Sequence, residues 1–186
     1  MRALFTALMC AAALPATAQS PFPVNIGGAY ELINQYGETR THADPSGHAQ
    51  LVFFGYANCL NICSAALPLM AEVVDVLAAE GITVTPVMIT VAPDQDQVDT
   101  MGAPLAEIHA DFIGLTGDAD ALQVAYDAFS VEVEPLFQDP EYGWIYSHGS
   151  FVHLLDGDGE TLTLLPPILN VEQAAKIART YVSAEG

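Results

Sequence analysis

The segment from Gln50 to Ala79, QLVFFGYANCLNICSAALPLMAEVVDVLAA, joins a strand pattern to a helix pattern through a short stretch that holds two cysteines. Gln50 to Tyr56 contains a continuous apolar run, which is typical of a strand buried on both faces. Beyond the cysteines, apolar residues recur at spacings of three and four. This spacing predicts one buried helix face, made of Leu67, Met70, Val74 and Leu77. Gly81 is expected to end the helix.

A second buried strand is predicted directly after this helix, from Ile82 to Val91, because the stretch is β-branched and apolar. Pro86 within it has no N–H group to donate, so we expect it at a sheet edge or at a bulge. Strand, helix and strand together make a βαβ unit with a parallel pair of strands. A further short strand is predicted upstream, from Ala29 to Ile33.

The carboxyl-terminal half predicts a helix, a hairpin and a last helix. The first helix is expected from about Asp118 to Phe129. Its apolar face is predicted to contain Leu122, Val124, Ala125, Tyr126 and Phe129. Phe151 to Leu155 and Thr161 to Leu165 flank the turn sequence DGDG, which favours a β-hairpin. Asn170 and Gln173 have the spacing of a cap at the start of the last helix.

This order of elements indicates a single α/β domain of the thioredoxin-like type. We expect a central mixed sheet flanked by helices, with a β-hairpin and a helix at the carboxyl-terminal end. The length of 186 residues suits one domain, and a hydrophobic content of 52% is enough for a packed core.

The amino terminus has the pattern of a secretory signal peptide over residues 1–18. Arg2 provides a positive charge, Ala3 to Leu14 form a short apolar run, and Ala16-Thr17-Ala18 fits a small-residue cleavage site. The apolar run is too short for a permanent transmembrane helix, so no membrane anchor is expected after cleavage. We therefore predict a periplasmic protein with a tether at residues 19–28 and a folded domain at residues 29–186.

The chain has a large excess of acidic over basic residues. Four lysine and arginine residues stand against 23 aspartate and glutamate residues, which gives a formal net charge of −19. Such a surface repels nucleic acids and anionic lipids, so neither is expected as a partner. Two interpretations remain open. The acidic surface is either adapted to solubility or salt, or it attracts a cation or a basic partner.

Cys59 and Cys63 are the two cysteines that stay after removal of the predicted signal peptide, which contains Cys10. They lie where a strand gives way to a helix, and the backbone N–H groups of a helix start lower the cost of forming a thiolate. Their spacing brings both sulfurs to the same side of the first helical turn. A soft-metal site, a reversible redox couple and an inert disulfide are the three alternatives.

A metal held by both sulfurs needs a third ligand from elsewhere, and the chain has five histidines. Copper suits a set of two sulfurs and one imidazole, because sulfur favours Cu(I) and nitrogen helps to hold Cu(II). His42, His48 and His109 are expected at the surface, and His153 inside a strand is expected to be packed. His148 lies in a Gly- and Ser-rich loop that could aim it at the cysteines.

Four blocks of the chain resemble the Sco/SenC family of copper proteins. FGYANCLNIC at residues 54–63 resembles the family's FGYT–CPxxCP signature with one extra residue between the cysteines. ITVAPDQD at 89–96 is similar to the family's TVDP-type segment, and GLTGDADAL at 114–122 to its loop into a later helix. YSHGSFVHLLDGDG at 146–159 is similar to its histidine, strand and turn.

The resemblance implies a thioredoxin-like fold and one copper ion, Cu(I) or Cu(II), bound by Cys59, Cys63 and His148. It implies a metallochaperone that hands copper to an acceptor protein, such as a subunit of cytochrome c oxidase, and is not itself an enzyme. The alternative is a thiol-disulfide oxidoreductase that uses the Cys59/Cys63 couple, and either role requires a thiol-disulfide reductant as a partner.

The chain departs from the family pattern at four positions around these ligands. Leu60 and Ser64 replace the two prolines of the cysteine motif, while Ala92 and Ser147 replace two acidic residues. Loss of the prolines restores backbone N–H donors near the sulfurs. Loss of the carboxylates removes groups that tune a site or contact a partner, but all three ligand positions are kept.

Overall fold

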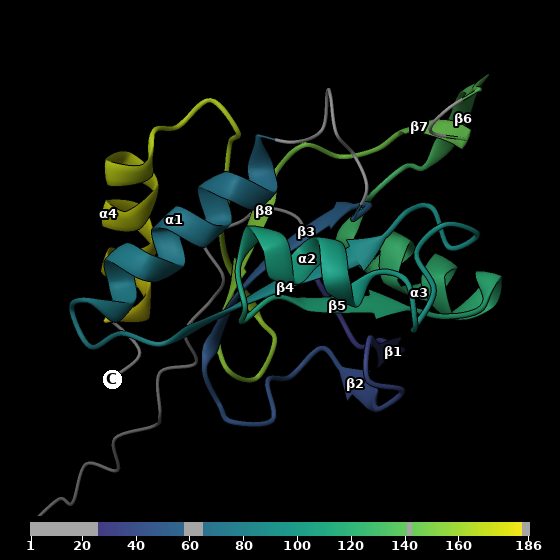
Figure 1. Cartoon of the computed structure of the whole chain (residues 1–186). Coiled ribbons are helices and arrows are strands. Elements are labelled where there is room, and N and C mark those ends of the chain that lie inside the picture. Colours follow the sequence, from purple (N-terminus) through teal and green to yellow (C-terminus); the bar gives the residue numbers. More distant parts are fainter. Residues whose placement is uncertain (1–25, 58–64, 141–142, 184–186) are drawn as a thin grey trace, which may run out of the picture.

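A seven-stranded mixed sheet runs through the part of the computed structural model that is described, residues 26–57, 65–140 and 143–183 (Figure 1). In order across the sheet, its strands are β2 (Thr39–Thr41), β1 (Glu31–Asn34), β5 (Ile113–Thr116), β4 (Val84–Thr90), β3 (Ala49–Gly55), β8 (Val152–Leu155) and β9 (Thr161–Leu165). The β3–β4 and β4–β5 pairs are parallel, and the other pairs are antiparallel.

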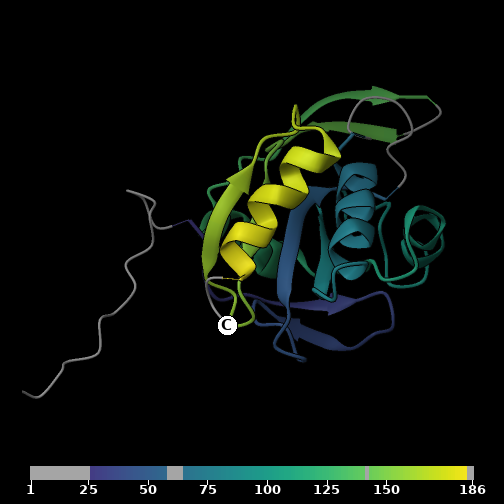
Figure 2. The same ribbon diagram turned by 90° about the vertical axis from the view of Figure 1, so that its left-hand side faces the viewer.

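Helices cover both faces of this sheet. One face is covered by α1 (Ala66–Ala78), α2 (Gly102–Ile108) and α4 (Val171–Val182), and the other by α3 (Ala119–Phe129). Figure 2 shows α1 and α4 side by side on their face of the sheet. The two cores therefore meet at the sheet, where Phe53 of β3 belongs to the α1 side and its neighbour Phe54 to the α3 side.

The predicted βαβ unit is confirmed as β3, α1 and β4. All seven residues of β3 are buried, and α1 buries the predicted face of Leu67, Met70, Val74 and Leu77. Gly81 follows α1 with a φ of 81°, a left-handed conformation that glycine adopts without strain.

Pro86 corrects one expectation, because β4 is an interior strand and its pairing with β3 shows no bulge. Pro86 pairs with Leu51 on the β3 side, while the pairing with β5 starts only at Val87. At Pro86, β4 is paired with β3 on one side but not yet with β5 on the other side. The missing N–H group of the proline therefore interrupts no pairing with β5.

The carboxyl-terminal elements are also confirmed. β8 and β9 form the antiparallel hairpin around residues 156–159. Asn170 and Gln173 make a full capping box at the start of α4, with each side chain bonded to the other residue's backbone N–H. In α3, Val124 is 52% exposed, so its predicted place on the buried face is wrong.

Several elements were not predicted. They are β2, α2, β5 and a separate two-stranded sheet of β6 (Glu134–Asp139) and β7 (Gly143–Ser147). The β6–β7 ribbon projects from the body of the domain, at the upper right of Figure 1. It carries the exposed apolar side chains of Leu136, Phe137 and Trp144.

The predicted signal peptide and residues 19–25 of the predicted tether lie outside the described residues. Residues 26–28 lie against the domain, since the Gly27 N–H donates to the Ala128 carbonyl oxygen at 2.8 Å and Ile26 packs on the α3-side core. No helix among the described residues has the length and apolar character needed to cross a membrane.

Candidate metal centre

The loop after β7 brings His148 to the carboxyl end of β3. The His148 ring lies edge-on to Phe53, with ring centroids 5.7 Å apart, and edge-on to Tyr56 at 6.1 Å. Phe53 and Tyr56 are themselves almost fully buried. His148 is half-buried, so two aromatic rings orient its imidazole at the end of the strand that leads to the cysteines.

A backbone contact indicates the tautomer of His148. Its Nδ1 lies 2.9 Å from the carbonyl oxygen of Gly149. A carbonyl oxygen can only accept, so Nδ1 carries the hydrogen in this contact, and in the neutral ring Nε2 then carries the lone pair. An imidazole held in this way has the form that binds a metal through Nε2.

Cys59 and Cys63 lie outside the described residues, within residues 58–64. The structure describes both flanks of that segment: Ala57 follows β3, and Ala65 is the N-cap of α1. Both cysteines therefore belong to the connection between the carboxyl end of β3 and the amino-terminal end of α1. Within residues 26–57, 65–140 and 143–183, no three His, Cys, Asp or Glu side chains form a group that could hold a metal ion.

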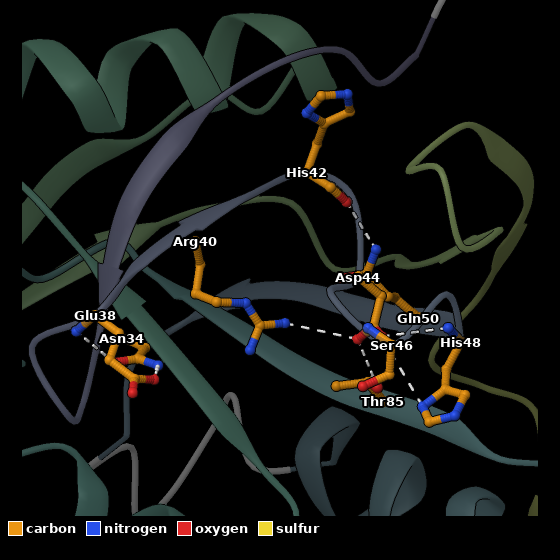
Figure 3. Close-up of polar contacts among 9 residues, drawn as sticks. All are labelled: Asn34, Glu38, Arg40, His42, Asp44, Ser46, His48, Gln50 and Thr85. Carbon is orange, nitrogen blue, oxygen red and sulfur yellow. Dashed lines mark hydrogen bonds and ion pairs between the residues drawn. The ribbon is translucent and has the colours of Figure 1, made fainter.

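His42 and His48 lie at the opposite end of β3, where Asp44 organises a polar network (Figure 3). Asp44 accepts a hydrogen bond from the Thr85 hydroxyl at 2.9 Å and lies 3.6 Å from Arg40. The Nδ1 of His48 is 3.9 Å from Asp44. β3 has 7 residues, so its two ends are roughly 20 Å apart, too far for these histidines to join a site beside Tyr56.

His109 contacts α1, and His153 packs on the other face of the sheet from His148. The Nε2 of His109 is 3.3 Å from Asp75, which lies in the carboxyl-terminal half of α1. His153 is 5% exposed, as expected for a packed histidine, and is edge-on to Phe54 and Phe129 on the α3 side. Burial lowers the pKa of His153 to about 4. Of the five histidines, all described, His148 is the one whose ring lies against both Phe53 and Tyr56, ahead of the cysteine segment.

Asp96, which contacts Ala57 ahead of the cysteine segment, is buried, and the sequence did not predict this. It lies after β4 in a run of polar residues that reads as a surface loop, yet its exposure is 0%. Its Oδ2 accepts hydrogen bonds from the Ala57 N–H at 3.0 Å and from the Thr90 hydroxyl at 2.8 Å. Desolvation raises its pKa above the usual range of an aspartate, although both hydrogen bonds oppose this shift.

The β6–β7 ribbon contacts the same loop. The Gln95 side-chain amide donates to the Trp144 carbonyl oxygen at 3.2 Å. Burial raises the pKa of Tyr146 on β7, and the nearby Asp94 carboxylate raises it further. The strand that leads into His148 is thus fixed to the segment that contains Asp96.

Comparisons with known proteins agree on one family. The SCO1/SenC family model matches residues 18–183. A SCO2-like protein of Rickettsia felis is 36% identical over 142 residues, which is 75% of this chain and 68% of that protein. The human mitochondrial SCO2 homologue is 30% identical over 159 residues, covering 84% of this chain and 60% of that protein.

Solved structures show the same fold. Yeast Sco1 with copper bound has a TM-score of 0.74 at 26% identity, covering 87% of this chain and 93% of that one. Copper-bound ScoI of Arabidopsis thaliana has a TM-score of 0.79 at 22% identity, covering 86% and 99%. BsSco, described as a member of the Sco family of cytochrome c oxidase assembly proteins with a disulfide switch, has a TM-score of 0.60 at 20% identity, covering 87% and 96%. The thioredoxin-like α/β fold is thereby confirmed.

Proposed function

Because the chain belongs to the SCO1/SenC family, we propose that it is an exported copper chaperone that holds one copper ion between Cys59, Cys63 and His148. The observation that carries this proposal is the place of His148. Its ring lies against Tyr56, just ahead of the cysteine segment, and its Nδ1 contact with Gly149 makes Nε2 the acceptor nitrogen of the neutral ring. Copper-bound structures of yeast Sco1 and Arabidopsis ScoI support copper as the cargo.

The chemistry of the three side chains suits a cargo that must be released again. Two thiolates in the segment that precedes α1 would favour Cu(I), and an imidazole adds a ligand that also suits Cu(II). The residues around His148 leave it accessible, since Ser147, Ser150 and Phe151 are exposed. An acceptor can therefore approach this loop and replace the copper ligands one at a time.

The family supports a proposal for the acceptor, and residues 1–18 support one for the compartment. BsSco is described as belonging to a family of cytochrome c oxidase assembly proteins, and we propose an oxidase subunit as the acceptor. Residues 1–18 would direct export, with cleavage after Ala18 and a periplasmic product. The replacements at Leu60, Ser64, Ala92 and Ser147 leave the three ligand positions of the family motif unchanged.

Thiol-disulfide exchange is the second candidate function, favoured by the disulfide switch described for BsSco. In that reaction the Cys59 thiolate attacks a partner disulfide and forms a mixed disulfide, and one partner sulfur leaves as a thiolate. Cys63 then displaces the second partner sulfur, which leaves Cys59–Cys63 oxidised and the partner reduced. This reaction needs no imidazole, so the effect of removing His148 separates the two functions.

Copper titration of the reduced protein tests the proposal. We expect one copper per chain and a thiolate-to-copper absorption band for Cu(II). Cys59→Ser, Cys63→Ser and His148→Ala should each lose more affinity than the roughly 10- to 100-fold that removal of an outer-shell partner of a metal site costs. His48→Ala is the matched control, because that imidazole lies at the far end of β3, and it should bind like the native protein. A His148→Ala variant with native stoichiometry, affinity and Cu(II) spectrum would refute the three-ligand site.

A further inference from the structure

Asp96 connects the chain ahead of the cysteines to the end of β4. Its Oδ2 accepts from the N–H of Ala57, the last described residue before the cysteine segment, and from the hydroxyl of Thr90. That hydroxyl in turn accepts from the Ala92 N–H at 2.9 Å. One buried carboxylate therefore determines how the chain leaves β3, because it fixes Ala57 against the neighbouring strand.

The charge of Asp96 has no visible counter-charge. Its Oδ1 is buried without a hydrogen-bond partner among the described residues, and no ion pair of the described residues involves it. The sequence has no lysine or arginine between Arg40 and Lys176. A buried carboxylate of this kind costs free energy unless a cation lies nearby, and such groups occur at functional sites more often than elsewhere.

The cysteine segment follows directly after the residue that Asp96 holds. Cys59 follows Ala57 by two residues, and two peptide units span about 7 Å at most between Cα atoms. A buried charge interacts more strongly with a nearby ion than an exposed charge does, because water and salt screen it less.

We propose that Asp96 is a positioning residue of the copper site, which fixes the chain ahead of Cys59 and whose negative charge favours a bound cation over the empty site. This inference rests on the proposed function. Asp96 itself is not a copper ligand in this proposal, since its Oδ2 is occupied by Ala57 and Thr90.

Alkylation of the reduced protein tests the charge without any copper. Iodoacetate is anionic and iodoacetamide is neutral, but both react with the same thiolate. The alkylation rate with iodoacetate divided by the rate with iodoacetamide therefore reports the electrostatic potential at the sulfur. In Asp96→Asn, which keeps an oxygen to accept from Ala57 and Thr90, we expect this ratio to rise severalfold. Asp99→Asn removes the same charge from an exposed residue of the same loop and should leave the ratio near the native value.

Copper affinity and thermal melting complete the experiment. Asp96→Asn should bind copper roughly tenfold more weakly than the native protein, whereas Asp99→Asn should stay close to native. Asp96→Ala, which also removes the acceptor for the Ala57 N–H, should bind more weakly still. Copper-free Asp96→Asn should melt at or above the native temperature, because it lacks an uncompensated buried charge. A purely structural carboxylate would instead lower the melting temperature and leave the ratio unchanged.

The outcomes separate this inference from the proposed function. A native ratio or a native copper affinity in Asp96→Asn would overturn the inference while leaving the three-ligand site intact. A native protein that binds no copper would refute the proposed function, and the alkylation ratio would still decide whether the Asp96 charge acts on the cysteines.

Discussion

His148 and His153 share one short stretch of sequence but have opposite environments. The ring of His148 is half-buried beside Phe53, while His153 is packed between Phe54 and Phe129 on the other face of the sheet. Phe53 and Phe54 alternate across β3, so the two histidines are separated by the sheet itself. The sequence separated them, because His153 falls inside an apolar strand pattern and His148 in the Gly- and Ser-rich run ahead of it.

The buried imidazole of His153 makes folding stability depend on pH. Its pKa is about 4 in the folded protein and about 6.5 in an unfolded chain, so the unfolded state binds more protons between these values. Stability is therefore fully present above about pH 6.5 and falls as the pH drops toward 4. At pH 5 the expected loss is about 2 kcal/mol.

Urea unfolding at pH 7.5 and pH 5 measures this loss. His153→Leu should remove about 2 kcal/mol of the difference between the two pH values, and His48→Ala should keep it. If His153→Leu showed the native pH dependence, the buried neutral form of His153 would be wrong.

The sequence predicted the helices and strands whose buried residues follow a regular apolar spacing, and those whose ends have specific turn or cap residues. The βαβ unit, the β8–β9 hairpin and α4 belong to this group. β5 has only 4 residues, and α2 has 7 with Pro104 inside it, so neither gives a readable period. The β6–β7 ribbon is almost wholly exposed, and without burial no alternation of apolar and polar residues marks it as sheet.

In the candidate site, too, only features with a local sequence pattern could be predicted. The cysteine pair was recognisable because it falls between a strand and a helix, but the burial of Asp96 depends on Ala57 and Thr90, which are distant in sequence. Asp94 and Asp99 on either side of it are exposed. Local sequence could not distinguish the one buried carboxylate from its exposed neighbours.

The capping box of α4 gives a prediction for a single element. Asn170→Ala removes the oxygen that accepts from the Gln173 N–H at 2.9 Å, and it should lower the free energy of unfolding by about 1 kcal/mol. Ser183→Ala, at the other end of the helix, has no capping role by its side chain and should be nearly neutral. Denaturant unfolding at pH 7.5 checks both variants, and equal stability of Asn170→Ala and native protein would contradict the capping role.

For the whole molecule, charge is the dominant feature. A formal net charge of −19 with no lysine or arginine between Arg40 and Lys176 leaves a long stretch of the domain without fixed positive charge. Mutual repulsion of the carboxylates then destabilises the compact state at low salt.

Salt should therefore stabilise this protein. Raising the NaCl concentration from about 10 mM to about 200 mM shortens the Debye length from about 30 Å to below 10 Å, and the melting temperature of the copper-free protein should rise. Thermal melting followed by circular dichroism checks this expectation. A melting temperature that fell with added salt would show that attractive ion pairs outweigh the repulsion.

The central claim is that two sulfurs and the imidazole of His148 hold one ion. X-ray absorption spectroscopy of the copper-loaded protein tests it most directly, because sulfur and nitrogen ligands scatter differently. We predict two sulfur ligands and one imidazole nitrogen in the native protein, with loss of that nitrogen in His148→Ala and its retention in His48→Ala. A native spectrum without imidazole, or an unchanged spectrum in His148→Ala, would contradict the account.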